Sequence, residues 1–250
     1  MLATHCLKAR IAALQQALER TPSIGNPTAA IQSVSLDSYA AVGPQAVTAT
    51  VDRYWNTGFA VVRCAEAPTP KRLLDLAGAL HLGEVFVPPL YRSGRPGTGA
   101  GGVSTLTVPA QRSGRGRHPS FESTGGQRLH VDGTLQPISV TTILLCETPA
   151  VSGGHTILFN ALGAFAELFQ VDPEAAVALT MPGCLVRQAT YGGCADQTAG
   201  PAFAICDGLL VTRYSVDTPS RWEVADGIDE QALHRAVTFM EQASRPHYPY

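Results

Sequence analysis

A histidine and an aspartate one residue apart, His130 and Asp132, are the pair in this sequence best suited to chemistry. In a β-strand, side chains two positions apart project from the same face, so a strand here would present an imidazole and a carboxylate together. Such a pair supplies two of the three ligands in the two-histidine-one-carboxylate arrangement that binds non-haem Fe(II) and leaves coordination positions open. A surface pair, or a structural histidine that hydrogen-bonds its neighbour, is the alternative interpretation.

The sequence after this pair contains two further features. An apolar run at 141–146, Thr-Thr-Ile-Leu-Leu-Cys, is followed by a turn-forming segment at 149–156, Pro-Ala-Val-Ser-Gly-Gly-His-Thr. Together with the strand-like Gly-Phe-Ala-Val-Val-Arg at 58–63 and Val-Thr-Arg-Tyr-Ser at 211–215, these features resemble the TauD and clavaminate-synthase-like family of Fe(II)- and 2-oxoglutarate-dependent dioxygenases. The resemblance extends from about residue 50 to residue 243.

The resemblance implies roles for three of these residues. His130 and Asp132 match the first two iron ligands of the family, and Thr156 matches the position whose hydroxyl hydrogen-bonds a carboxylate of 2-oxoglutarate. For Thr156, a β-branched strand residue with a locally satisfied hydroxyl is the alternative. Gly153 and Gly154 are expected to serve the turn, because glycine tolerates positive φ. The implied cofactors are Fe(II) and 2-oxoglutarate, with O2 as cosubstrate.

The resemblance also narrows the reaction. Related halogenases carry a small residue at the position of Asp132, so the carboxylate predicts a hydroxylase, with desaturation, epoxidation or cyclisation as alternatives. The expected reaction hydroxylates an unactivated C–H bond of a small molecule, an amino acid or a specialised metabolite, and decarboxylates 2-oxoglutarate to succinate. Two other functions stay open: a truncated or degenerate non-catalytic relative acting as a binding scaffold, and a cupin-like metal protein that does not use 2-oxoglutarate.

The third iron ligand is not identified by the sequence. In the family, a second histidine lies far C-terminal of the pair in a "DN…HGR" element, and the arginine anchors 2-oxoglutarate. Nothing after Tyr214 matches that element. Either the chain is C-terminally truncated, or His247 is recruited as the ligand, although Pro246 and Pro249 flank it and no arginine follows it directly.

Periodicity predicts an α+β chain with a sheet or barrel flanked by helices, which the resemblance narrows to a double-stranded β-helix, or cupin-like jelly roll. We expect one dioxygenase-like domain at 1–250, with a helical region at about 1–56 and a jelly-roll core at about 57–250 that lacks the C-terminal strands. Helices are expected near 6–20, 45–56, 70–81, 161–170, 173–180 and 230–243. Strands are expected near 58–63, 103–108, 128–132, 138–146, 155–160, 184–190, 202–206 and 209–214.

Two loop segments are the expected source of substrate selectivity. The glycine- and proline-rich stretch at 88–128 and the stretch at 190–200 are typical of loops that close over a pocket. Tyr191 and Asp196 are candidate substrate contacts, with ordinary loop residues as the alternative. Arg213 is a candidate contact to an anionic substrate or cosubstrate, with a structural ion pair as the alternative.

The composition restricts the class of protein. The 250 residues are 45% hydrophobic and 15% charged with a net charge of −2, which indicates a globular chain without the basic surface that nucleic acid or an anionic membrane attracts. The expected partner is a small-molecule substrate, and homo-oligomerisation stays open. Neither a signal peptide nor a membrane-length apolar run is found, so the expected location is cytoplasmic. The six cysteines lack metal-site spacing and are expected to be free thiols, buried where they lie in apolar runs, as at Cys146 and Cys206.

Overall fold

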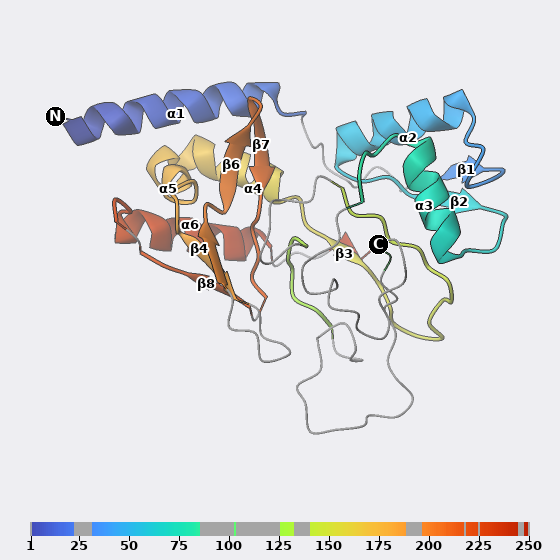
Figure 1. Cartoon of the computed structure of the whole chain (residues 1–250). Coiled ribbons are helices and arrows are strands. Elements are labelled where there is room, and N and C mark those ends of the chain that lie inside the picture. The colour runs from blue at the N-terminus through green and yellow to red at the C-terminus, as the bar shows by residue number, and fades with distance from the viewer. Residues whose placement is uncertain are drawn as a thin grey trace. The chain divides into compact units, whose positions relative to one another are not determined.

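The computed structural model describes residues 2–22, 32–85, 103, 126–132, 141–188, 197–217, 219–224, 226–244 and 248–249 (Figure 1). The chain divides into two compact units. Unit 1 comprises Met1–Pro22, Thr107–Ile138 and Ile157–Pro249. Unit 2 comprises Ser23–Leu106, Ser139–Thr156 and Tyr250.

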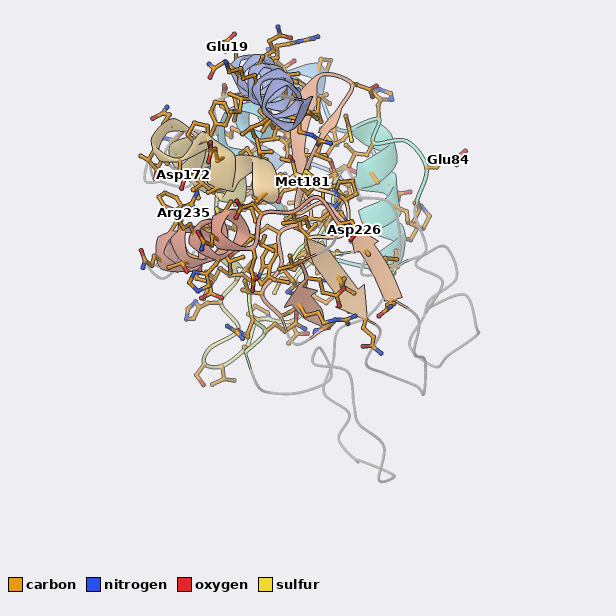
Figure 2. All side chains as sticks on the ribbon, turned by 90° about the vertical axis from the view of Figure 1, so that its left-hand side faces the viewer. Glu19, Glu84, Asp172, Met181, Asp226 and Arg235 are labelled. Carbon is orange, nitrogen blue, oxygen red and sulfur yellow. The ribbon has the colours of Figure 1, made fainter. Side chains whose placement is uncertain are left out.

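Four helices belong to unit 1: α1 (Leu2–Arg20), α4 (Ala161–Val171), α5 (Pro173–Ala178) and α6 (Glu230–Ala243). Three of them begin after a side chain that accepts a hydrogen bond from a backbone N–H of the first turn, which satisfies a donor that has no partner within the helix. These capping residues are Asn160, Asp172 and Asp229. Asp172 also accepts a hydrogen bond of 2.7 Å from Arg235 Nε, so the start of α5 is tied to α6 (Figure 2).

The strands of unit 1 form three small sheets. β4 (Leu185–Gln188) lies between β5 (Gln197–Gly200) and β8 (Ser220–Trp222), and both neighbours are antiparallel to it. β6 (Phe203–Cys206) and β7 (Leu209–Thr212) form a hairpin whose turn, Asp207-Gly208, has positive φ at both positions. An Asp-Gly pair favours this turn, whose twist matches that of the strands. β3 (Ile157–Leu158) pairs antiparallel with β9 (Tyr248–Pro249).

The core of unit 1 joins these helices and sheets through aromatic side chains. Phe165 of α4 stacks on Phe203 of β6 with 4.3 Å between ring centroids. The ring centroid of Tyr214, just after β7, lies 6.2 Å from that of Phe203 and 6.0 Å from that of Trp222 of β8. Because α1 packs Leu14 into the same core, residues distant in sequence share one apolar interior.

Unit 2 has a smaller core. It contains α2 (Pro44–Thr57), α3 (Pro70–Ala79) and a parallel pair of strands, β1 (Val34–Leu36) and β2 (Val62–Cys64). The buried hydrophobic residues of its core are Val34, Leu36, Tyr39 and Leu76. α2 ends at Gly58, whose φ of 82° lets the chain leave the helix, as the C-terminal cap of a helix often requires.

The mixture of helices and sheets is confirmed, and each of the six predicted helices is present within a few residues of its expected bounds. In the described part of the chain, the strands form four small sheets and no closed barrel. The strand predicted at 103–108 lies outside the described residues except for residue 103. No helix in the described ranges combines the length and apolar character needed to cross a membrane.

Two strand predictions are wrong for the residues described, since 128–132 and 141–146 contain no strand. Backbone groups of residues 129–131 instead hydrogen-bond to a loop and to side chains, so this segment does not pair with a neighbouring strand. Burial was predicted wrongly for Cys146 and Cys206, which are free thiols but exposed. Cys206 is exposed because it ends β6 beside the hairpin turn. Cys184 is buried as expected, and burial raises the pKa of its thiol to about 11.

Candidate active site

His130 and Asp132 point at each other in unit 1. His130 Nε2 lies 3.5 Å from Asp132 Oδ1, and the side chains are 27% and 54% exposed. This contact, in which Nε2 donates to the carboxylate when the ring is protonated, is the main cause that raises the pKa of His130, against the opposing effect of burial. The sequence therefore predicted the convergence of the two side chains correctly, although the segment that carries them is not a strand.

The other nitrogen of the His130 ring fixes its tautomer. Nδ1 lies 2.8 Å from the carbonyl oxygen of Arg128, and a carbonyl only accepts, so Nδ1 carries the proton. A neutral ring then has its lone pair on Nε2, on the side of Asp132. Metal-binding histidines commonly donate their second nitrogen to a backbone carbonyl in this way. The imidazole and carboxylate thus fit as two of the ligands that a non-haem Fe(II) site requires.

The backbone between the two side chains is held by unit 1. Val131 N–H donates to Ser215 Oγ at 3.1 Å, and Val131 C=O accepts from Arg187 Nη1 at 2.7 Å. Val216 N–H donates to Leu129 C=O at 2.9 Å. These bonds connect the segment to β4 and to the chain that follows β7.

Arg187 is the largest fully buried side chain of the described residues, with 2% of its side chain exposed. Burial lowers its pKa, and the charge of Asp217 opposes that change. Its Nη2 donates to Asp217 Oδ2 at 3.3 Å, whereas Nε is buried with no partner. Asp217 Oδ1 in turn accepts from Ser220 Oγ. A buried charge is costly unless it is paired, so this network is required to keep Arg187 inside the protein.

Thr156 lies in unit 2, directly after the predicted turn. Gly153 and Gly154 have φ values of 73° and 71°, so the prediction that glycine serves this turn is confirmed. A Cβ at Gly154 would come 3.0 Å from the Cβ of Ala150. Thr156 itself is exposed, and its role toward 2-oxoglutarate stays a prediction.

Arg213 lies in unit 1, two residues before Ser215, and is partly buried. Its Nη2 donates to Thr198 Oγ1 at 3.0 Å, and the absence of a side chain at Gly200 leaves room for the guanidinium. Burial lowers the pKa of Arg213, and the charge of Arg187 lowers it further. Within the part of the chain that the structure describes, no carboxylate forms an ion pair with Arg213.

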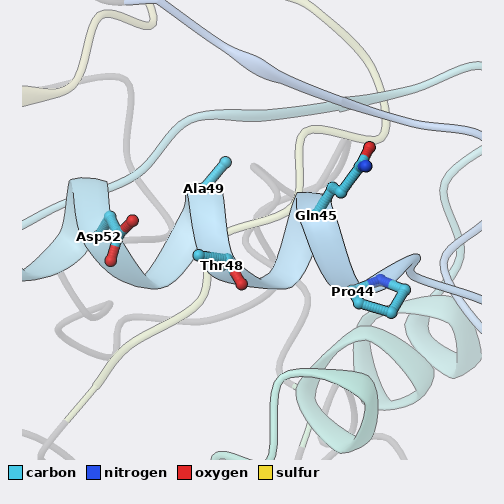
Figure 3. Close-up of a pocket in the computed structure, with 5 residues that line it drawn as sticks. All are labelled: Pro44, Gln45, Thr48, Ala49 and Asp52. Carbon is cyan, nitrogen blue, oxygen red and sulfur yellow. The ribbon is translucent and has the colours of Figure 1, made fainter.

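Three other predicted residues, Tyr191, Asp196 and His247, lie outside the described residues. Among the residues that are described, no group of three His, Cys, Asp or Glu side chains is placed to hold a metal ion. An open pocket in unit 2 follows one face of α2 (Figure 3). It contains none of the predicted site residues; its lining is Pro44, Gln45, Thr48, Ala49 and Asp52.

Comparison with known proteins identifies the class. Residues 17–239 match the profile of the family described as "Taurine catabolism dioxygenase TauD, TfdA family". The chain belongs to this family, whose dioxygenases use Fe(II), 2-oxoglutarate and O2, and it is accordingly a non-haem iron dioxygenase.

Two curated relatives carry the same name. A "Uridine-5'-phosphate dioxygenase" of Amycolatopsis sp. is 39% identical over 206 residues, which cover 80% of this chain and 72% of the relative. A "Uridine-5'-phosphate dioxygenase" of Streptomyces sp. is 40% identical over 198 residues, which cover 76% of this chain and 69% of the relative.

Sequence inspection did not single out Arg187 and Asp217. A usable signal was present, because Arg187 follows Leu185 and Val186 in a strand that otherwise reads as buried. An arginine in such a strand requires a carboxylate or carbonyl partner. Which residues supply it depends on chain segments that are distant in sequence.

Proposed function

We propose that this dioxygenase oxidises a C–H bond of uridine 5'-phosphate or a closely similar nucleotide. The observation that carries the proposal is the identity of 39% and 40% with two relatives named for uridine 5'-phosphate, over about three quarters of the chain. A nucleotide is a small molecule, but it is neither an amino acid nor a specialised metabolite, so the proposal replaces the narrower substrate class expected from the sequence.

His130 Nε2 and the carboxylate of Asp132 are the proposed protein ligands of Fe(II). The bound iron, with 2-oxoglutarate and O2, supplies the oxidising power, and 2-oxoglutarate is converted to succinate. The contribution of the protein is to orient these groups: the Arg128 carbonyl holds the proton on Nδ1, which keeps Nε2 available as a ligand. The Thr156 hydroxyl is proposed to donate to a carboxylate of 2-oxoglutarate. The third ligand, for which the sequence offers His247, is outside this assignment.

Arg213 is the proposed contact to the phosphate group of the substrate. Its described partner, Thr198, is a neutral hydroxyl, and the nearby guanidinium of Arg187 makes the surroundings more positive. An anion would relieve the cost of this partly buried charge, and a guanidinium matches phosphate geometry with two parallel hydrogen bonds. Tyr191 and Asp196 remain proposed substrate contacts because they lie in the stretch at 190–200, which the sequence predicts to be a loop that closes over a pocket.

Hydroxylation rather than halogenation is proposed because Asp132 is a carboxylate. A carboxylate ligand would occupy the position that halide needs, and Asp132 Oδ1 lies 3.5 Å from His130 Nε2, the other proposed ligand atom. The finer fold assignment belongs to the proposal too: a single dioxygenase-like domain at 1–250, with a helical region at about 1–56 and a jelly-roll core at about 57–250.

The test is an assay of the full chain with Fe(II), 2-oxoglutarate, O2 and uridine 5'-phosphate, in which succinate and remaining nucleotide are measured together. Stoichiometric loss of nucleotide and formation of succinate are expected, and uridine, which lacks the phosphate, should turn over at least about tenfold more slowly, as loss of a charge-assisted contact predicts. In R213M, the preference for the phosphorylated substrate should largely disappear.

Four results would contradict parts of the proposal. If uridine and uridine 5'-phosphate turn over equally in the wild type, the phosphate is not recognised. If no nucleotide promotes succinate formation, the substrate assignment is wrong; and if no 2-oxoglutarate is consumed under any condition, the binding-scaffold alternative is favoured. A chlorinated product in the presence of chloride would contradict the hydroxylase assignment.

A further inference from the structure

The peptide groups on both sides of Val131 are held by residues far away in the sequence. The N–H of Val131 belongs to the peptide that joins it to His130, and the C=O belongs to the peptide that joins it to Asp132. Ser215 Oγ accepts from the first at 3.1 Å, and Arg187 Nη1 donates to the second at 2.7 Å. With both peptide planes fixed, the positions of the two flanking Cα atoms are fixed, and the bond from Val216 N–H to Leu129 C=O, which holds the next peptide plane, fixes the direction of the His130 Cα–Cβ bond as well.

The hydrogen-bond directions at Ser215 are consistent. The hydroxyl proton is donated to Arg213 C=O at 3.1 Å, which leaves the oxygen lone pairs free to accept from Val131 N–H. Ser215 is completely buried, so water does not compete for these bonds.

Burying the Arg187 side chain at this position costs free energy. Its neighbours Leu185 and Val186 are buried apolar residues, and an apolar side chain at 187 would avoid the cost of burying a guanidinium. The Arg187 side chain uses Nη2 on Asp217 and Nη1 on Val131, while Nε has no partner. Nη1 and Nη2 of Arg187 therefore connect the Val131 carbonyl to Asp217. Asp217 is held in turn by a hydrogen bond from Ser220 of β8.

We infer that Arg187 and Ser215 are positioning residues for the metal-binding pair. They hold the backbone between His130 and Asp132 so that both side chains converge on one metal ion. This inference rests on the proposed assignment of His130 and Asp132 as ligands. Neither Arg187 nor Ser215 contacts the metal; each acts through the Val131 peptide groups.

Co(II) is the probe for the test, because it replaces Fe(II) without oxidation and its visible absorption reports ligand geometry. The full-length apoprotein is titrated with Co(II), and the melting temperature of each apo variant is measured separately. Changes to the groups that hold metal ligands in place commonly weaken metal binding by about 10–100-fold, and this range is expected for R187M. R187K should recover part of the loss, since its ammonium can donate to the Val131 carbonyl, and S215A should weaken Co(II) binding several-fold with an altered visible spectrum.

The matched control is R235M. Arg235 pairs with Asp172 through a hydrogen bond of 2.7 Å in the same unit, but its side chain is 47% exposed (Figure 2). Loss of this pair should leave Co(II) affinity and spectrum unchanged. A purely structural role of Arg187 would lower the melting temperature but leave the Co(II) affinity of the folded protein unaltered.

Wild-type Co(II) affinity in folded R187M would overturn the inference for Arg187. If R187M does not fold, S215A decides: weakened binding with an altered spectrum supports the inference, and wild-type binding overturns it. H130A separates this result from the underlying assignment. If H130A binds Co(II) as the wild type does, the ligand assignment itself is wrong and the inference fails with it; if only H130A loses binding, the ligands are right and the positioning role is wrong.

Discussion

The segment that carries His130 and Asp132 and the segment that carries Thr156 are held in different ways. Residues 129–131 form three hydrogen bonds to residues of β4 and of the chain after β7, one of them from the buried Arg187. Residues 150–156 are exposed, and their path is set by positive φ at two glycines. Metal ligands must keep a fixed mutual geometry, whereas a single hydroxyl that assists a bound cosubstrate tolerates more freedom.

The largest expected effect concerns the ligand pair. H130A should lower 2-oxoglutarate turnover by about 1000-fold or more, because a non-haem iron site that loses a protein ligand binds the metal poorly. Succinate formation measures the loss. H234A, which removes an exposed histidine of α6, is the matched control and should retain full turnover. Equal activity of both variants would show that His130 is not a ligand.

The hydrogen bonds of the first segment predict a large effect on stability. R187M leaves the Val131 carbonyl and Asp217, whose side chain is 16% exposed, without their partner. Removing one member of a fully buried pair typically costs about 3–5 kcal/mol, and because Asp217 is partly exposed we expect a loss of about 3 kcal/mol. Urea unfolding at neutral pH should reveal the loss as a lower midpoint. A change below about 1 kcal/mol, the size found for surface pairs, would mean that water replaces the lost contacts and that this segment is not specially held.

A smaller effect is expected at Thr156. T156V keeps the shape of the side chain and removes the hydroxyl, so KM for 2-oxoglutarate should rise about fivefold to tenfold, as loss of a hydrogen bond of about 1–1.5 kcal/mol predicts. The melting temperature should not change, because Thr156 is exposed. T156S, which restores the hydroxyl, should recover the KM. If T156V and the wild type have the same KM, Thr156 is an ordinary residue of the turn.

The smallest effect is expected at the exposed counterpart of the Arg187–Asp217 pair. The hydrogen bond from Arg235 lowers the pKa of Asp172, so the folded state holds this carboxylate ionised more strongly than the unfolded state does. The associated stability is present above the ordinary pKa of aspartate, near 3.9, and is lost as the pH falls through the lowered value. R235M should therefore be slightly less stable than the wild type at pH 7 and equal to it in strong acid. A larger loss at low pH than at pH 7 would contradict this assignment.

The sequence by itself predicted the six helices, because apolar periodicity is a local property of the sequence. It also predicted the family. The convergence of His130 and Asp132 was predicted from strand spacing; the side chains do meet, but in a segment that is not a strand, so spacing is not the reason. The glycines of the turn before Thr156 were correctly assigned for a local reason as well, since φ is a property of one residue.

Only the tertiary structure decided how the site is held. The strand expected at 128–132 is absent because Ser215, Arg187 and Val216 satisfy its peptide groups in place of a neighbouring strand. Such partners lie more than fifty residues away in sequence, and spacing carries no information about them. The tautomer of His130 was likewise decided by a backbone carbonyl that only the folded chain places beside Nδ1.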